Sequence, residues 1–209
     1  MNARETVLGR VRDALALAPR PAVAVSRDYR RGRGLPDPER LDLLVDRLVD
    51  YKAQVRTCTA TETSATLAEM LAGLGARRVG IPAGLDRTWL SDWTGDLVED
   101  RPDVPAPSLA ELDAVVTASA VTCAETGTIF LDGSHDQGRR ALTLVPDVHV
   151  CVVDLSQVTA GIPEAMERLV PERPTTLISG PSATSDIELE RVEGVHGPRT
   201  LVVVIRTDR

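Results

Sequence analysis

The chain has 209 residues, of which 43% are hydrophobic, and its 24 basic and 31 acidic residues give a formal net charge of −7. At roughly 150 residues per domain, this length and composition predict one globular domain with a sizeable core. Aromatic residues make up only 2% of the chain. A nucleic-acid ligand is therefore not expected, since that affinity depends on clustered Lys and Arg and on base stacking.

The three cysteines, Cys58, Cys123 and Cys151, lie far apart in apolar segments, and no Cys-x-x-Cys pair is present. The sequence therefore encodes neither a cysteine-ligated iron–sulfur cluster nor a structural zinc site. It also shows no secretory signal and no apolar run of about 20 residues. We expect reduced thiols, no membrane span and a cytoplasmic location.

The first 38 residues are predicted to form a segment separate from the rest. Apolar residues recur at helical spacing over 3–18, which indicates an amphipathic helix. Residues 19–38 hold four prolines and five arginines, carry a local charge of +3, and are interpreted as a flexible linker. That linker is either a solvated tether or an arm that docks an acidic partner or an anionic ligand. Residues 39–209 form the predicted domain.

Strand and helix patterns alternate in the first half of this domain. The predicted strands are 54–58, 77–81 and 114–120. The predicted helices are 41–49, 63–74, a short one near Trp89, and 108–113. Gly75 is placed to end the second of these helices. This alternation predicts an α/β fold of three α/β/α layers, with a mostly parallel sheet covered by helices on both faces.

An antiparallel hairpin is predicted in the second half. Residues 127–131 and 141–145 are apolar and flank Asp132-Gly133, which is a turn signal. Residues 148–155 form a continuous apolar run, as a central strand does. The remaining predicted elements are a helix over 163–170 and strands over 175–179 and 200–205, the last of which closes the sheet.

Polar residues gather directly after the predicted strand 175–179. A loop at the carboxyl end of a parallel strand, with a helix starting in it, is a common place for an anion to bind. We expect Ile187, Leu189 and Val192 to form that helix. The candidate ligand-binding residues of the loop are Gly180, Ser182, Thr184, Ser185 and Asp186. The alternative is that Ser185 or Asp186 caps the helix and nothing binds.

Glu125 is a carboxylate within an otherwise apolar region. Burial would raise its pKa and suit it to general acid–base or nucleophilic catalysis. Its neighbours Thr126, Gly127 and Thr128 are candidate substrate contacts. The alternative is a structural ion pair with Arg140 or Arg199, with Gly127 marking a bulge.

Two further candidates lie in predicted turns. His196, between glycines before the last strand, could titrate near neutral pH and act on a ligand, or could simply bond to backbone. Arg140, together with Arg139, could hold a substrate carboxylate in a bidentate fork or could be solvated. The histidine spacing matches no metal motif, and the glycine-rich loops of Walker and Rossmann nucleotide sites are absent.

Several of these segments together resemble the lactate utilization protein C family, which has a LUD domain. The resemblance covers about residues 40–206 and rests on Glu125-Thr-Gly-Thr128, Leu144-Val-Pro-Asp-Val-His149, Ser179-Gly-Pro-Ser182, Asp186-Ile-Glu188 and Gly194-Val-His-Gly-Pro198. It implies a fold similar to the NagB/RpiA/CoA-transferase group. It also implies a role in oxidising L-lactate to pyruvate with two partner proteins that carry iron–sulfur clusters. This chain, without a cluster of its own, would bind a small carboxylate substrate or assemble the complex.

Two other functions remain open. Glu125-Thr-Gly resembles the setting of the nucleophilic glutamate in CoA transferases, where the carboxylate forms an acyl–enzyme intermediate. The chain could instead be a non-catalytic docking subunit. In the reading that we favour, five side chains converge on one cleft: Glu125, Ser182, Thr184, Asp186 and His196.

Overall fold

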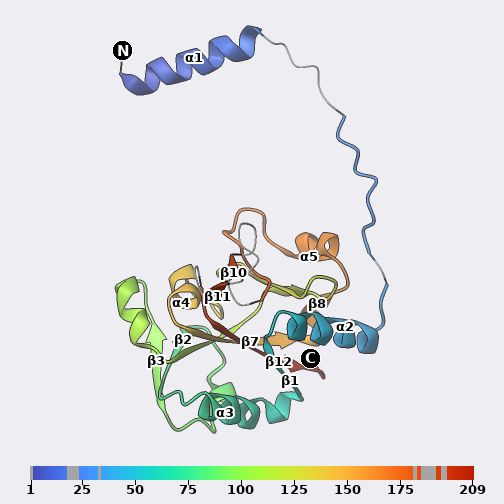
Figure 1. Ribbon diagram of the computed structural model, residues 1–209, viewed down its shortest axis with the longest axis vertical. Coiled ribbons are helices and arrows are strands. Elements are labelled where there is room, and N and C mark those ends of the chain that lie inside the picture. Colours follow the sequence, from blue (N-terminus) through green and yellow to red (C-terminus); the bar gives the residue numbers. More distant parts are fainter. Residues whose placement is uncertain (1, 18–23, 33, 181–182, 185–191, 194–196) are drawn as a thin grey trace. The chain divides into compact units, whose positions relative to one another are not determined.

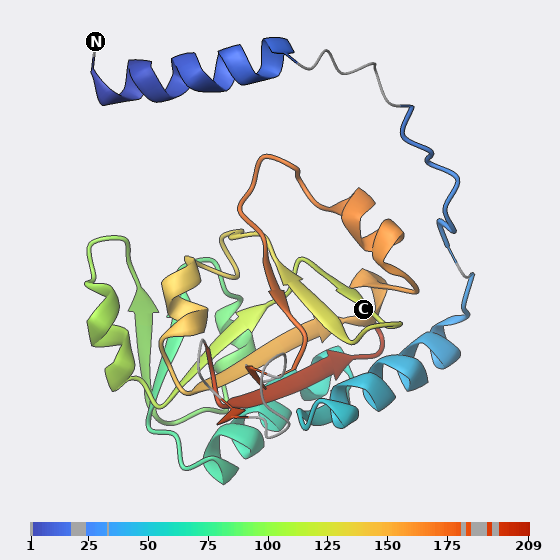
Figure 2. The same ribbon diagram turned by 45° about the horizontal axis from the view of Figure 1, so that its top comes forward.

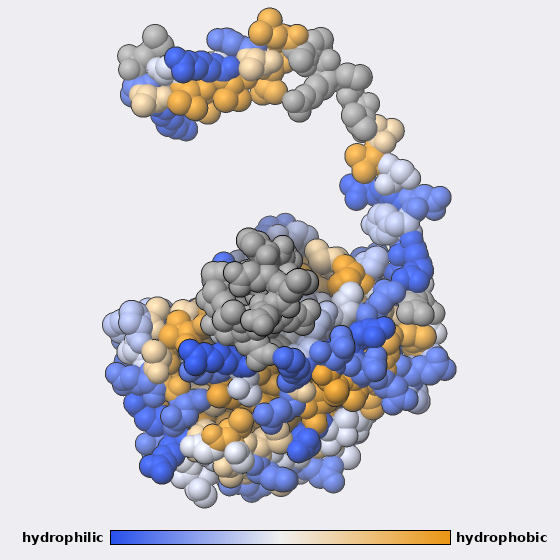
Figure 3. Space-filling view, in the orientation of Figure 1, coloured by the Kyte–Doolittle hydropathy of each residue, from blue (hydrophilic) through white to orange (hydrophobic). Residues whose placement is uncertain are grey.

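The computed structural model describes residues 2–17, 24–32, 34–180, 183–184, 192–193 and 197–209. The chain divides into two compact units, Met1–Arg30 and Arg31–Arg209. The first unit contains helix α1 (Ala3–Leu17), which confirms the predicted N-terminal helix and buries none of its residues. Apolar side chains gather along this helix (Figure 3), and the exposed ones are Val7, Val11, Leu15 and Leu17. In the described ranges, no helix is long and apolar enough to cross a membrane.

Six parallel strands form the central sheet of the second unit, in the order β1-β12-β7-β4-β2-β3 (Figure 1). Their bounds are β1 (Gln54–Cys58), β2 (Arg78–Pro82), β3 (Asp96–Asp100), β4 (Ala114–Ala118), β7 (Val148–Asp154) and β12 (Thr200–Arg206). The five middle residues of β7 and of β12 are all buried, because both faces of these strands are covered. The last strand, β12, completes the sheet from an interior position, between β1 and β7.

One face of the sheet is covered by helix α3 (Thr63–Gly73) and the 3₁₀ turn η2 (Arg87–Leu90). Leu67 and Leu71 of α3 pack on alternate residues of β7 and β12 such as Val150. A second 3₁₀ turn, η1 (Ala60–Glu62), leads into α3. Gly75 follows α3 with a φ of 69°, a conformation that ends helices, as predicted.

The other face is covered by helix α2 (Asp37–Asp50) and by a second sheet, which crosses the main one (Figure 2). The second sheet has the order β8-β5-β6-β9, with β5 (Val121–Cys123), β6 (Thr128–Leu131), β8 (Val158–Thr159) and β9 (Thr176–Ile178). Leu44 and Leu48 of α2 and Ile129 of β6 share one core cluster with Cys151 and Val203 of the main sheet. The third layer is thus part helix and part sheet.

The predicted hairpin between 127–131 and 141–145 is wrong; the structure instead has an antiparallel hairpin of β5 and β6. Residues Arg140–Leu144 form helix α4, and β6 pairs antiparallel with β5 and with β9. The apolar run 141–145 is too short for its periodicity to distinguish a helix from a strand. Leu142 is fully buried against Val115, so the run presents one helical side to the core. The hairpin turn lies at residues 124–127, where Gly127 has a φ of 63°.

The remaining elements are short. They are η3 (Ala106–Glu111), η4 (Leu155–Gln157), α5 (Ile162–Arg168), β10 (Ala183–Thr184) and β11 (Val192–Glu193). Thr184 pairs antiparallel with Val192, so Val192 lies in a strand and the helix predicted there is wrong at this residue. The ladder satisfies main-chain groups that a helix would have paired internally. Ile187 and Leu189 lie outside the described residues.

Candidate functional site

The carboxyl ends of the parallel strands meet at one edge of the main sheet. Ligands of open α/β sheets bind at this edge, at the point where neighbouring connections leave in opposite directions. Here the chain passes from β2 outward to β3 and then returns to β4, after which β7 and β12 extend the sheet the other way. The switch point therefore lies between β2 and β4.

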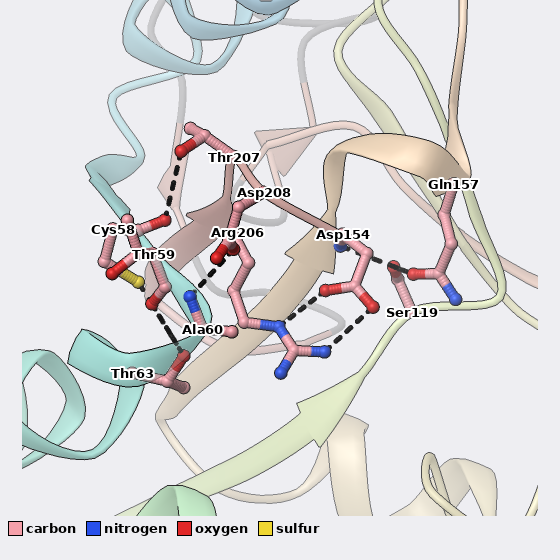
Figure 4. A network of polar contacts seen from close by, with 10 residues as sticks. All are labelled: Cys58, Thr59, Ala60, Thr63, Ser119, Asp154, Gln157, Arg206, Thr207 and Asp208. Carbon is pink, nitrogen blue, oxygen red and sulfur yellow. Dashed lines mark hydrogen bonds and ion pairs between the residues drawn. The ribbon is translucent and has the colours of Figure 1, made fainter.

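At the other half of this edge, the ends of β7 and β12 are closed by the chain's own side chains (Figure 4). Arg206 donates two hydrogen bonds to the Asp154 carboxylate, at 2.6 and 2.8 Å, and its guanidinium carbon lies 4.5 Å from the Trp89 ring centroid. The Ser119 hydroxyl donates to Gln157 Oε1 at 3.3 Å. The polar side chains at this half of the edge therefore hydrogen-bond to one another.

An open cleft of about 640 Å³ lies at the ends of β2 and β3, next to the switch point. We call it the switch-point cleft. Its apolar lining consists of Pro82, Ala83, Pro102, Ala141 and Pro174. Its polar lining consists of Asp100, Ser134, His135, Arg139 and Arg140, and two glycines, Gly133 and Gly138, complete it.

The segment 132–138, which forms one wall of the cleft, is held by hydrogen bonds around Asp132. The Asp132 amide donates to Gln137 Oε1 at 2.7 Å, and its carboxylate accepts from the Ser134 hydroxyl at 2.6 Å and from Arg173 at 2.9 Å. Burial opposes ionisation of Asp132, but the hydrogen bonds from Ser134 and Arg173 outweigh it and lower its pKa. The segment is thus fixed in place.

The same segment is tied to the ends of two strands of the main sheet. The Gly84 amide donates to the His135 carbonyl at 3.0 Å, and the Ala118 amide donates to the Asp136 carbonyl at 3.0 Å. The His135 ring lies directly on Gly84, where a Cβ atom would collide with it. The imidazole is therefore positioned on the cleft wall by residues just beyond β2 and β4.

The two arginines that were expected to form a carboxylate fork differ in their surroundings. Arg139 forms such a fork with Asp100 of the same chain, at 2.9 Å through Nε and 2.8 Å through Nη2, and also donates to the Val104 carbonyl. The pKa of Arg139 is raised because the hydrogen bonds to the Asp100 carboxylate stabilise the protonated guanidinium. Arg140 is exposed in the cleft lining. Within the described part of the chain, no side chain pairs with its guanidinium.

Glu125 lies elsewhere, in the β5–β6 turn, where it is half-buried. Its amide donates to the Ala160 carbonyl at 3.2 Å, and its carbonyl accepts from Arg47 Nε at 3.2 Å. Its carboxylate lies beside Gly161, at the start of α5. Arg199, one of its two suggested ion-pair partners, instead lies 3.7 Å from Asp147.

The structure brings the β5–β6 turn together with the start of the 179–188 loop. Thr126 Oγ1 donates to Thr128 Oγ1 at 2.8 Å, and Thr128 Oγ1 lies 2.8 Å from Ser179 Oγ. Gly127 and Gly180 both pack against the end of α2. A Cβ at Gly127 would lie 2.9 Å from Arg47 Cβ, and one at Gly180 would lie 2.7 Å from Tyr51 Cβ. Both glycines are needed for this close packing.

The other predicted loop residues cannot be placed. Ser182, Ser185, Asp186 and His196 lie outside the described residues, as does the side chain of Thr184. Their convergence with Glu125 on one cleft stays a prediction. Arg140 follows the opposite end of β6 from the Glu125 turn, so these two candidates belong to separate neighbourhoods.

His149 and Cys151 form a buried polar centre in β7. His149 Nε2 lies 2.8 Å from Thr117 Oγ1, and Nδ1 has no hydrogen-bond partner among the residues that the structure describes. Burial lowers the pKa of His149 to about 4 and raises that of Cys151 to about 12, so both are neutral at pH 7. Among the described residues, no three His, Cys, Asp or Glu side chains are grouped so that they could hold a metal ion.

The sequence reasoning missed most of the switch-point cleft. The segment after Asp132-Gly133 was predicted to be a hairpin turn, because residues 141–145 were interpreted as the returning strand. No signal in the sequence gives the strand order that brings this segment to the end of β2.

Comparisons with known proteins identify the family. The LUD domain family matches residues 87–205. Lactate utilization protein C of Deinococcus radiodurans is 46% identical over 164 residues, which cover 77% of this chain and 76% of that protein. Lactate utilization protein C of Anoxybacillus flavithermus is 28% identical over 85% of this chain and 84% of that protein. A crystal structure of a DUF162 family protein from Deinococcus radiodurans matches with a TM-score of 0.71 and 39% identity, covering 82% of this chain and 99% of that chain. These matches confirm the resemblance and the α/β class, and the chain therefore belongs to the LUD-domain family, as a lactate utilization protein C homologue.

Proposed function

We propose that this chain is a subunit of a multi-component system that oxidises L-lactate to pyruvate, with iron–sulfur clusters on two partner proteins. The observation that carries this proposal is the 46% identity to lactate utilization protein C of Deinococcus radiodurans over about three quarters of both chains. The position of a cleft at the ligand-binding edge of the sheet supports a binding role.

The roles that we assign to this chain and to its partners follow from the chemistry of the reaction. Oxidation of L-lactate removes two electrons and two protons, and the electrons need an acceptor. An iron–sulfur cluster held only by thiolates uses four cysteines. The three cysteines of this chain are buried on separate strands, β1, β5 and β7. We therefore assign the redox centres to the partners, and substrate binding or assembly to this chain.

Within this role, Glu125 is our candidate acceptor for the substrate hydroxyl proton, with His196 as a second candidate. Residues 126–128 and the 180–186 loop would hold a small carboxylate. The hydrogen-bonded row of Thr126, Thr128 and Ser179 supports this assignment, because it joins the two segments directly beside Glu125.

The test is L-lactate oxidation by the two iron–sulfur proteins with an artificial electron acceptor, measured with and without this chain. We expect activity only when the chain is present. The Glu125→Gln variant should then lower the rate at least tenfold, whereas Glu69→Gln, which changes an exposed carboxylate on α3, should not.

Full activity without the chain would refute the subunit role. A Glu125→Gln variant with the wild-type rate would leave a docking subunit in place and refute the role of Glu125. Incubation with an acyl-CoA followed by mass spectrometry tests the acyl-transfer alternative, since that route forms a covalent adduct on Glu125.

A further inference from the structure

We propose that the switch-point cleft binds an organic oxyanion with an apolar body larger than lactate, held by Arg140 and His135. The site is separate from the Glu125 turn to which we assigned lactate. It can therefore be tested without the lactate-oxidising partners, and its failure would leave the proposed subunit role untouched.

The charge of the cleft favours an anion. Arg139 already holds the Asp100 carboxylate through Nε and Nη2 and also donates from Nη2 to the Val104 carbonyl. Arg140 is exposed in the lining, without a partner in the part of the chain that the structure describes. Two arginines and one aspartate give the lining a net charge of +1, with His135 counted as neutral, on a chain whose net charge is −7. A guanidinium in such a cleft attracts carboxylates or phosphates and binds them through paired hydrogen bonds.

The wall of the cleft that carries His135 is ordered before any ligand arrives. The His135 ring lies on Gly84 with no room for a Cβ between them, and its carbonyl is bonded to the Gly84 amide. The Asp132 carboxylate ties the same segment to Arg173. A wall that is already ordered loses little conformational entropy on binding.

The size and lining of the cleft indicate what the rest of the ligand is like, apart from its anionic group. Its volume of about 640 Å³ is roughly twenty times the 30 Å³ share of one water in the liquid, and lies within the roughly 300–1,000 Å³ of small-molecule and cofactor sites. A three-carbon acid would fill only a small part of it. Beside the polar residues, the walls carry three prolines and two alanines, among them Pro82, Pro102 and Ala83, and a proline has no backbone N–H to donate. A larger, apolar body suits this lining.

The first probe is 1-anilinonaphthalene-8-sulfonate, an aromatic body with one oxyanion whose fluorescence rises in apolar sites. We expect saturable binding to the folded full-length chain. Arg140→Gln should raise the Kd about tenfold, since it removes a charge-assisted contact. Ala83→Trp should abolish binding by filling the cleft. Arg77→Gln, which removes an exposed arginine at the amino end of β2, is the matched control and should leave the Kd unchanged.

Competition then identifies the anionic group. Octanoate offers a carboxylate on an apolar body, and naphthyl phosphate offers a phosphate, so displacement of the probe by either one supports the site and names its chemistry. Displacement by neither would overturn the proposal. So would equal binding by wild-type, Arg140→Gln and Ala83→Trp proteins whose circular dichroism spectra are alike. Because both substituted positions are exposed, we expect these variants to fold.

Discussion

Replacing Asp154 by asparagine tests how strongly the closed half of the carboxyl edge stabilises the fold. The substitution keeps the shape of the side chain but removes the negative partner of Arg206, whose two hydrogen bonds to it measure 2.6 and 2.8 Å. Removing one partner of a buried pair costs about 3–5 kcal/mol, whereas exposed pairs are worth about 0–1 kcal/mol. The Arg206 side chain is 12% exposed and the Asp154 side chain 22%, so the pair is not fully buried. In the variant, Trp89 still stacks on the Arg206 guanidinium. We therefore expect the free energy of unfolding to fall by about 2 kcal/mol.

Urea unfolding followed by circular dichroism measures this loss. With an m-value of about 2 kcal/mol/M, the midpoint should fall by about 1 M. The double variant Asp154→Asn/Arg206→Met should recover part of the loss, because no unpaired charge is left behind. Asp103→Asn is the matched control, since its ion pair with Arg101 is 63% and 72% exposed. Equal losses for Asp154→Asn and Asp103→Asn, or strictly additive losses in the double variant, would refute a coupled buried pair.

Three further predictions concern the core and the β5–β6 turn. Burial lowers the pKa of His149 from 6.5 to about 4, so the unfolded chain binds a proton that the folded chain does not; the free energy of unfolding should fall by up to about 3 kcal/mol as the pH drops from 6.5 to 4. The free energy of unfolding, measured by urea at several pH values, should lose this pH dependence in the His149→Gln variant. The same pH dependence in both proteins would contradict the prediction. Gly127→Ala, at a φ of 63° and with its Cβ 2.9 Å from Arg47 Cβ, should cost about 1–3 kcal/mol in thermal unfolding, whereas Gly73→Ala, with nothing within 4 Å, should be neutral or stabilising. The three buried thiols should react with a thiol reagent only at the rate of unfolding, and rapid labelling of the native protein would show that the core is open.

Five of the six strands of the main sheet were predicted, and the apolar runs of β2, β4, β7 and β12 are the reason for four of them. Residues 148–154 are the clearest case, since a strand buried on both faces needs no alternation of polar and apolar side chains. Strand β3 was missed, because three of its five residues are acidic. In the second sheet, β6 and β9 match the predicted strands 127–131 and 175–179, but the sheet itself was not predicted. Its strands β5, β6 and β9 have only three or four residues each, and the pairing of β6 with β9 depends on contacts between distant parts of the chain.

The candidate site also has a part that could be predicted from the sequence and a part that could not. From the sequence, Glu125 and the loop after 175–179 were placed at one cleft, and the structure brings the β5–β6 turn to the start of that loop, at Thr128 and Ser179. The switch-point cleft was not predicted. Its lining depends on the fork between Arg139 and Asp100, which are 39 positions apart, and on a helix of five residues at Arg140–Leu144. No local pattern in the sequence encodes either feature.

The position of β12 has a consequence for how the protein is made. Of the strands of the main sheet, β12 is the last to leave the ribosome, yet it lies between β1, the first of them, and β7. Until it emerges, two strands of the nascent chain each lack a neighbour and expose unpaired main-chain groups, which are potential aggregation sites. A ribosome-bound chain stalled before residue 200 should therefore stay sensitive to protease, whatever the time of incubation.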